Sequence, residues 1–184
     1  PDCRASPFAW RALTAVSARF AFVAFAGAGA AVGAAPARQS KEAAMSALGL
    51  KIIDESVQAA NIWINDVDME MGWTHKQRSY RLLRAMLHAL RDHLSVDEAA
   101  QLGAQLPTLI RGVYYEGWNP SKTPIIERAR AGLEARVQAD FHGDPLEDVA
   151  EAIAAVFSVL RAHVSAGEIA HVEQSFTREV RALF

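Results

Sequence analysis

The feature that most constrains this chain is an internal repeat. The stretch 84–118 recurs as 154–184 without a gap, at the constant offset of 70 positions that separates Ala85 from Ala155. The identical pairs are Ala85/Ala155, Leu90/Leu160, Arg91/Arg161, His93/His163, Ser95/Ser165, Glu98/Glu168, Ala100/Ala170 and Arg111/Arg181. Most other aligned positions are apolar in both copies. A duplicated segment implies that one set of elements describes both halves of the chain.

Apolar residues recur at steps of three and four along the chain, which is typical of amphipathic helices. In the first half this spacing predicts four helices, over 48–71, 74–93, 96–105 and 107–116. The first of these helices carries the apolar stripe Ile53, Val57, Ala60, Ile64, Val67 and Met71. The second half repeats the plan with a helix over 126–141, a long helix capped by Asp144, a short helix and a last helix that ends at Phe184.

Polar residues predict where several of these helices begin. Ser95 and Glu98 have the spacing of a capping box, in which the serine oxygen accepts from a first-turn amide and the glutamate accepts from the N-cap amide. Ser165 and Glu168 repeat this spacing in the second half. Thr74 is expected to cap the second helix.

No segment shows the alternation and turn dipeptides of a β-hairpin. We therefore predict an all-α protein with two tandem four-helix repeats, about 45–119 and 120–184, packed as one bundle-like domain. The two repeats are expected to share one hydrophobic core or two fused ones. A composition of 51% hydrophobic and 22% charged residues agrees with a globular domain and excludes a disordered chain.

Residues 1–44 differ in composition from the rest and leave two interpretations open. In the favoured one they are untranslated upstream read-through or a disordered leader, and translation starts at Met45, because the preceding Lys41-Glu42 can be encoded as a ribosome-binding sequence. In the alternative they are a signal peptide with basic residues, an uncharged stretch and a small-residue cleavage site at 35–37. The first interpretation predicts a cytoplasmic protein, and the second predicts export of the chain that follows residue 37.

The charge balance restricts the partners of residues 45–184. Residues 1–44 hold 5 of the 19 Lys and Arg and 2 of the 21 Asp and Glu, which leaves 14 basic and 19 acidic residues and a formal charge of −5. An acidic domain argues against broad binding to a phosphate backbone. We expect neither a nucleic-acid partner nor a membrane span in this part of the chain.

Histidines are the first candidates for a metal site. His93 and His163 recur in the repeat, each in the last turn before a capping-box serine, where an imidazolium suits the negative end of the helix and the ring can donate to a carbonyl. Glu168 and His171 have the E-x-x-H spacing of di-metal bundles, but the position that matches His171 is Gln101. The acidic residues of the first helix are interpreted as a solvated face. We predict no metal site and no cofactor.

Candidate site residues come from the parts that the repeat does not explain. No phosphate loop, nucleophile elbow or catalytic triad order is visible, so no catalytic residue is assigned. Tyr115, Glu116 and Trp118 have no counterpart in the second copy. With Trp63 and Arg111 they are our candidate interaction or pocket residues, because such aromatics either pack the two halves together or form a recognition patch.

Several segments from Met45 onward resemble a family of uncharacterised prokaryotic proteins, the DUF2267 family. They are the opening MSALGLKIIDESVQAANIWINDV, then AAQLGAQLP and YYEGW, and last VFSVLRAHVSAGEI. The resemblance covers essentially all of 45–184 and supports Met45 as the start. It implies a small helical, cytosolic protein without an established activity, and it brings no catalytic residues to carry over.

The sequence leaves two hypotheses for function. The favoured one is a cytoplasmic, non-enzymatic helical protein that acts through protein–protein contacts, with self-association as one form of them. The alternative is a protein that binds or converts a small molecule in a pocket between the two repeats, near Trp63, Arg111, Tyr115 and Trp118.

Overall fold

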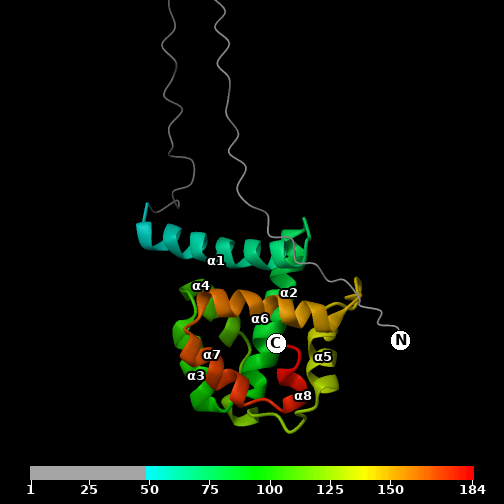
Figure 1. Cartoon of the computed structure of the whole chain (residues 1–184). Helices are drawn as coiled ribbons and strands as arrows, with labels where there is room; N and C mark the ends of the chain where they lie inside the picture. The colour runs from blue at the N-terminus through cyan, green and yellow to red at the C-terminus, as the bar shows by residue number, and fades with distance from the viewer. Residues whose placement is uncertain (1–48) are drawn as a thin grey trace, which may run out of the picture. The chain divides into compact units, whose positions relative to one another are not determined.

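The computed structural model describes residues 49–184, which contain eight α-helices, one short 3-10 helix and no strand. The elements are α1 (Lys51–Glu70), α2 (Lys76–His93), α3 (Val96–Gln105), α4 (Thr108–Tyr115), η1 (Pro120–Lys122), α5 (Arg130–Ala139), α6 (Val149–His163), α7 (Ala166–Gln174) and α8 (Arg178–Arg181) (Figure 1). The predicted all-α class is therefore confirmed for this part of the chain. The predictions made for residues 1–44 lie outside the described residues.

Two helices of the first half, α2 and α3, begin where a side chain accepts from a first-turn amide. Ser95 and Glu98 form the predicted capping box, with Glu98 N donating to Ser95 Oγ at 3.3 Å and Ser95 N donating to Glu98 Oε2 at 2.8 Å. The cap of α2 is His75 rather than Thr74, because the Nδ1 atom of His75 accepts from the backbone amide of Arg78 at 3.3 Å. The capping box at Ser95 and Glu98 is thus confirmed, whereas the predicted cap Thr74 is wrong.

Two long helices of the second half begin later than predicted. Residues 120–122 form η1, and α5 starts only at Arg130 instead of 126. Asp148 caps α6, since its Oδ1 atom accepts from Glu151 N at 3.0 Å. The prediction that Asp144 caps this helix is wrong; its carboxylate accepts a hydrogen bond from Arg78 Nη1 at 2.8 Å instead.

Residues that the repeat makes identical do not make identical contacts. The second predicted capping box is absent, because Ser165 precedes α7 without a side-chain hydrogen bond to that helix. Helix bounds nonetheless agree at the offset of 70, which carries α6 onto 79–93 within α2. The duplication itself stays a prediction from the sequence.

His93 lies buried at the end of α2, with its Nδ1 atom 2.6 Å from the carbonyl oxygen of Ala89. The expected hydrogen bond to a helix-end carbonyl is therefore present. Burial lowers the pKa of His93, and this outweighs the opposing effect of the bond to Ala89. The imidazolium predicted at this position is wrong, since a buried ring without a carboxylate partner is neutral at pH 7.

One hydrophobic core joins both halves. It receives buried side chains from all eight helices, among them Val67 of α1, Leu90 of α2, Val137 of α5 and Phe157 of α6. Helices of the first half also contact helices of the second half directly: α1 contacts α6, and α2 contacts α5. Neither half can therefore bury its apolar face without the other, and burial of each large side chain contributes about 1.5–3 kcal/mol.

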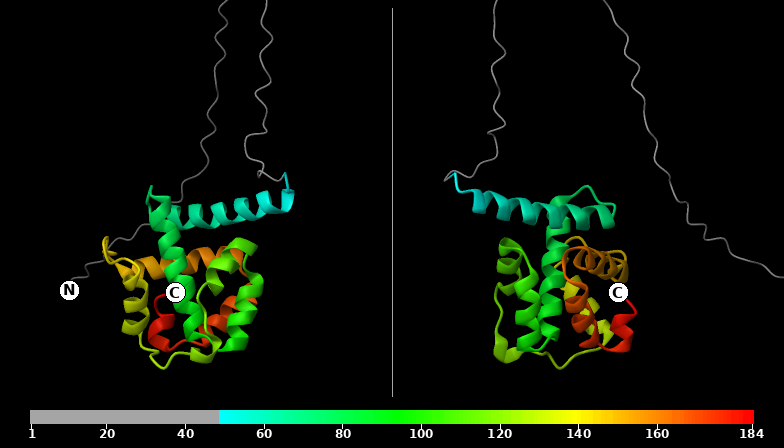
Figure 2. Two further views of the ribbon diagram at one scale, coloured as in Figure 1. Left: turned by 180° about the vertical axis from the view of Figure 1, so that it is seen from behind. Right: turned by 60° about the vertical axis from the view of Figure 1, so that its left-hand side comes forward.

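The helix α1 extends past the body that it packs on. Figures 1 and 2 show its C-terminal part lying across the other helices and its N-terminal end projecting beyond them. Its apolar stripe reflects this placement, because Val67 is 0% exposed whereas Ile53 and Val57 are each 44% exposed. The predicted stripe is continuous in sequence, but the body covers only its C-terminal part.

Candidate functional site

The first candidate residue, Trp63, belongs to α1 and packs against the end of α6. Its ring is buried and stacks on His163 with ring centroids 4.9 Å apart. The Nε2 atom of His163 lies 2.6 Å from Asp66 Oδ2, so α1 holds this histidine from two sides. A shallow pocket of ≈ 220 Å³ borders Trp63 and His163 together with Pro107.

Tyr115 and Trp118 form an aromatic cluster at the end of α4. Their ring centroids are 5.3 Å apart, and Tyr115 also meets Tyr114 edge-on at 4.9 Å. The indole Nε1 of Trp118 is buried without a hydrogen-bond partner among the described residues. Gly103 makes room for the Tyr115 ring, since a Cβ atom at position 103 would overlap the hydroxyl of Tyr115. Both aromatics therefore pack mainly against their own half.

Glu116 and Arg111 are tied to other groups. Glu116 Oε2 accepts from Arg84 Nε at 3.0 Å, and this hydrogen bond lowers the pKa of Glu116. Arg84 also reaches Asp140 at 3.2 Å, which links α2 to the end of α5. Arg111 donates to the carbonyl oxygen of Leu106 at 3.1 Å. Tyr115 and Trp118 thus lie together, whereas Trp63, Arg111 and Glu116 each make contacts of their own.

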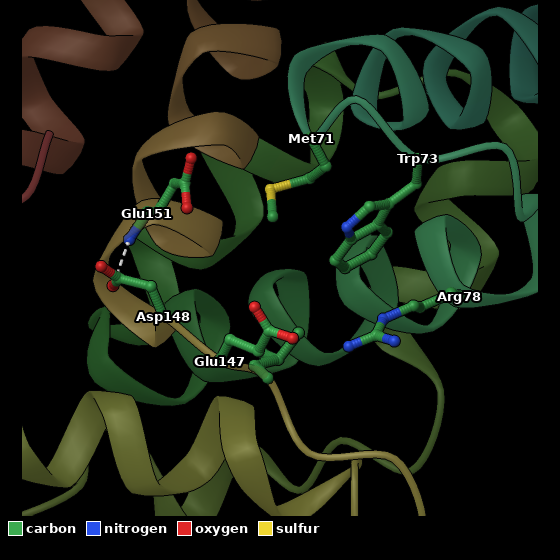
Figure 3. A pocket seen from close by; sticks show the side chains of 7 residues that line it. Met71, Trp73, Arg78, Glu147, Asp148 and Glu151 are labelled. Carbon is green, nitrogen blue, oxygen red and sulfur yellow. Dashed lines mark hydrogen bonds between the residues drawn. The ribbon is translucent and has the colours of Figure 1, made fainter.

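A different pocket lies between the α1–α2 turn and the start of α6 (Figure 3). We call it the acidic pocket; its volume is ≈ 250 Å³ and its lining consists of Met71, Trp73, Arg78, Leu146, Glu147, Asp148 and Glu151. The thioether of Met71 and the indole of Trp73 come from the turn, whereas the three carboxylates come from the start of α6. No sequence signal marks this pocket, because the two segments are far apart along the chain and neither contains a motif.

Asp68 fixes the turn that carries Met71 and Trp73. Its side chain is 4% exposed and accepts hydrogen bonds from Lys76 Nζ at 2.6 Å, from His75 N at 3.2 Å and from the hydroxyl of Ser79. The bond from Lys76 lowers the pKa of Asp68 most, and the bond from Ser79 adds to it. The interpretation of this aspartate as part of a solvated face is therefore wrong.

Arg78 connects the two walls of the acidic pocket. Its guanidinium carbon lies 4.6 Å from the centre of the Trp73 ring, a cation–π contact. Its Nη1 donates to Asp144 Oδ1 at 2.8 Å and its Nη2 to the carbonyl oxygen of Pro145 at 3.2 Å. The positive charge of Arg78 is thus already paired, and no sequence signal links residues 66 positions apart.

Within residues 49–184, no group of three His, Cys, Asp or Glu side chains is placed to hold a metal ion. No helix in the same range is long and apolar enough to cross a membrane.

The fold defines an all-α domain in which eight helices share one core. The family model described as "Uncharacterized conserved protein (DUF2267)" matches residues 60–183, and the chain belongs to this DUF2267 family. The resemblance inferred from the sequence is thereby confirmed. A comparison with curated proteins finds no match.

Proposed function

We propose that this protein is a cytoplasmic, non-enzymatic helical protein that binds a protein partner through the N-terminal turns of α1. The observation that supports the proposal is the uncovered end of the α1 stripe, where Ile53 and Val57 stay 44% exposed. Leu50 precedes them at 49% exposure and extends the same surface. Apolar side chains grouped in this way are typical of contact surfaces, whereas singly exposed ones are common on any protein.

The partner that fits this surface carries an amphipathic helix. Helices that lie side by side bury apolar residues at steps of three and four, which is the spacing of the α1 stripe. A second copy of the chain meets this requirement with its own α1, so self-association is one form of the same contact.

A pair of charge substitutions tests the proposal in the full chain. The variant Ile53→Glu/Val57→Glu places two carboxylates on the surface, and Ile126→Glu changes a fully exposed isoleucine outside it. Sedimentation velocity and crosslinking in the native host should show a defined complex with the wild type and with I126E. The complex should be lost with the double variant, because desolvating a charge at an apolar contact is costly. A complex that survives in all three chains, or a monomer that crosslinks to nothing, contradicts the proposal.

A second candidate function is the binding of a small anion between the two halves. A cavity of ≈ 280 Å³ lies among Arg91, Asp92, Lys122 and Arg136, next to the segment that connects α4 to α5. Arg91 donates to the carbonyl oxygens of Tyr114 at 2.6 Å and of Glu116 at 3.0 Å. Asp92 pairs with Arg91 at 2.9 Å and with Arg136 at 3.2 Å, which leaves Lys122 as the cation of this cavity without an ion pair among residues 49–184. Three cations beside one carboxylate favour an anionic ligand. Citrate or inorganic phosphate should then raise the melting temperature of the wild type but not of Lys122→Gln.

A further inference from the structure

We propose that the shallow pocket beside Trp63 binds a primary carboxamide carried on a small apolar group. We call it the tryptophan pocket; its volume is ≈ 220 Å³ and its lining consists of Ala59, Ile62, Trp63, Gln105, Pro107 and His163. The proposed partner surface consists of other residues, Leu50, Ile53 and Val57, at the N-terminal end of α1. The two inferences can therefore fail separately.

Three segments that are far apart in the sequence form the tryptophan pocket. Helix α1 provides three residues, the end of α3 and the turn that follows it provide Gln105 and Pro107, and the last residue of α6 provides His163. The side chains of Ala59, Ile62 and Pro107 give the pocket an apolar surface. A hydrocarbon group that packs on this surface is removed from water, which favours binding.

The indole of Trp63 supplies a hydrogen-bond donor that has no acceptor. Trp63 is 2% exposed, and its ring stacks on His163, but its Nε1 atom donates to none of residues 49–184. A buried indole N–H usually finds an acceptor. Trp118 Nε1 also lacks one, but that atom is fully enclosed, whereas Trp63 Nε1 is not among the enclosed atoms. An acceptor bound in the tryptophan pocket would complete the hydrogen bonding of Trp63.

His163 supplies a hydrogen-bond acceptor next to this donor. Its Nε2 atom lies 2.6 Å from Asp66 Oδ2. A carboxylate only accepts hydrogen bonds, so Nε2 carries the hydrogen, and Nδ1 of the neutral ring is left as an acceptor. Within residues 49–184, Nδ1 of His163 has no hydrogen-bond partner and is not enclosed. The donor and the acceptor belong to stacked rings whose centroids are 4.9 Å apart.

A carboxamide matches this pair better than other small polar groups do. Its carbonyl oxygen can accept from Trp63 Nε1, and its N–H can donate to His163 Nδ1. A carboxylate offers acceptors alone and would stand near the negative charge of Asp66, whereas a ketone lacks the donor. The volume of ≈ 220 Å³ is below the roughly 300–1,000 Å³ of pockets for drug-sized ligands and suits one polar group on a short apolar stem.

The test uses isobutyramide as the probe. Methyl isopropyl ketone, which lacks the N–H groups, and isobutyrate, which lacks them and is charged, are its counterparts. Each is titrated at about pH 8, where imidazole is usually neutral, into the full-length, ¹⁵N-labelled chain. The indole N–H resonance of Trp63 is followed after assignment with Trp63→Phe. Isobutyramide should shift this resonance in a saturable way with a millimolar dissociation constant, and both counterparts should bind about threefold more weakly or less.

A variant that fills the tryptophan pocket carries the decision. Ala59→Leu extends a half-buried side chain of the pocket lining and should abolish the saturable shift. Ala131→Leu makes the same change at an exposed position of α5 and should bind as the wild type does. Circular dichroism confirms that both variants are folded. Trp63→Phe keeps a ring but removes the donor, and its affinity, measured by saturation transfer to the methyl groups of isobutyramide, should fall about threefold to tenfold.

Four outcomes would overturn the proposal. They are the absence of a saturable shift in the wild type, equal affinity of Ala59→Leu and Ala131→Leu, unchanged affinity of Trp63→Phe, and equal binding of the amide and the ketone.

A further arm of the same titration separates the two sources of such a carboxamide. The peptide acetyl-Gly-Gln-Gly-amide presents it as a side chain of a protein, and acetyl-Gly-Glu-Gly-amide is the control for the rest of the peptide. Binding of the glutamine peptide that is tighter than that of isobutyramide assigns the pocket to a glutamine side chain of a partner. Weaker binding of the glutamine peptide assigns it to a free small carboxamide.

Discussion

The two serines related by the repeat, Ser95 and Ser165, should respond differently to the same substitution. Ser95→Ala removes the oxygen that accepts from Glu98 N at 3.3 Å, and such a change at an N-cap costs about 1 kcal/mol. Ser165→Ala removes no cap hydrogen bond and should change the free energy of unfolding by less than about 0.5 kcal/mol. Sequence alone would assign both substitutions the same cost.

Urea unfolding followed by circular dichroism measures this difference. With a slope near 2 kcal/mol per molar urea, the midpoint of Ser95→Ala should fall by about 0.5 M, and that of Ser165→Ala should stay within about 0.25 M of the wild type. Equal shifts of the two midpoints, or a larger shift for Ser165→Ala, would refute the reasoning that the observed hydrogen bond carries the stabilisation.

Acid provides a second readout of the same cap. Burial raises the pKa of Glu98, but hydrogen bonds from the Ser175 hydroxyl and from Ser95 outweigh it, so the pKa falls below its usual 4.5. A carboxyl whose pKa is lower in the folded state adds stability above the unfolded pKa and loses it as the pH falls through the folded pKa. Glu98→Gln should therefore lose less stability than the wild type between about pH 5 and pH 3.

Four further substitutions test the core and its surroundings. Leu90→Ala should lower the free energy of unfolding by about 2–5 kcal/mol in urea titrations, because the side chain is fully buried, and a loss below about 0.5 kcal/mol would move it to the surface. In the wild type, the lowered pKa of the buried His93 ring means that the unfolded chain binds a proton more readily than the folded chain, so the wild type loses stability as the pH falls below 6.5. His93→Gln should make this loss smaller, and an unchanged dependence of unfolding on pH would contradict the prediction. Gly103→Ala should lower the free energy of unfolding by about 1–3 kcal/mol, because the new methyl group overlaps the Tyr115 side chain. Gly112→Ala is the control: its methyl group meets nothing within 4 Å, and the change should stabilise α4 by about 0.5–1 kcal/mol. If the melting temperatures of both variants move in the same direction, the packing inferred at position 103 is wrong.

Local signals in the sequence predicted most of the secondary structure correctly. The steps of three and four predicted eight helices, and the capping box at Ser95 and Glu98 predicted the start of α3 at the correct residue. Both signals depend on neighbours within four positions, so they can be recognised along the chain, although the box at Ser165 and Glu168 shows that the same spacing does not always form the hydrogen bonds. The cap predictions failed at Thr74, where the neighbouring His75 caps α2, at Asp144, whose carboxylate pairs with the distant Arg78, and at Ser165, whose side chain makes no cap hydrogen bond.

The sequence alone thus determined that the part from residue 49 to residue 184 is all-α, which residues form the apolar stripes and which family the chain belongs to. Only the tertiary structure decided which of two identical or similar residues is buried and which partner each one contacts. It buried His93 yet set His163 against Asp66, and it covered Val67 yet left Ile53 exposed on the same stripe. It also brought Trp73 and Arg78 to the start of α6, where the acidic pocket forms. These outcomes depend on contacts between residues tens of positions apart, and only the packing of the helices brings such residues together.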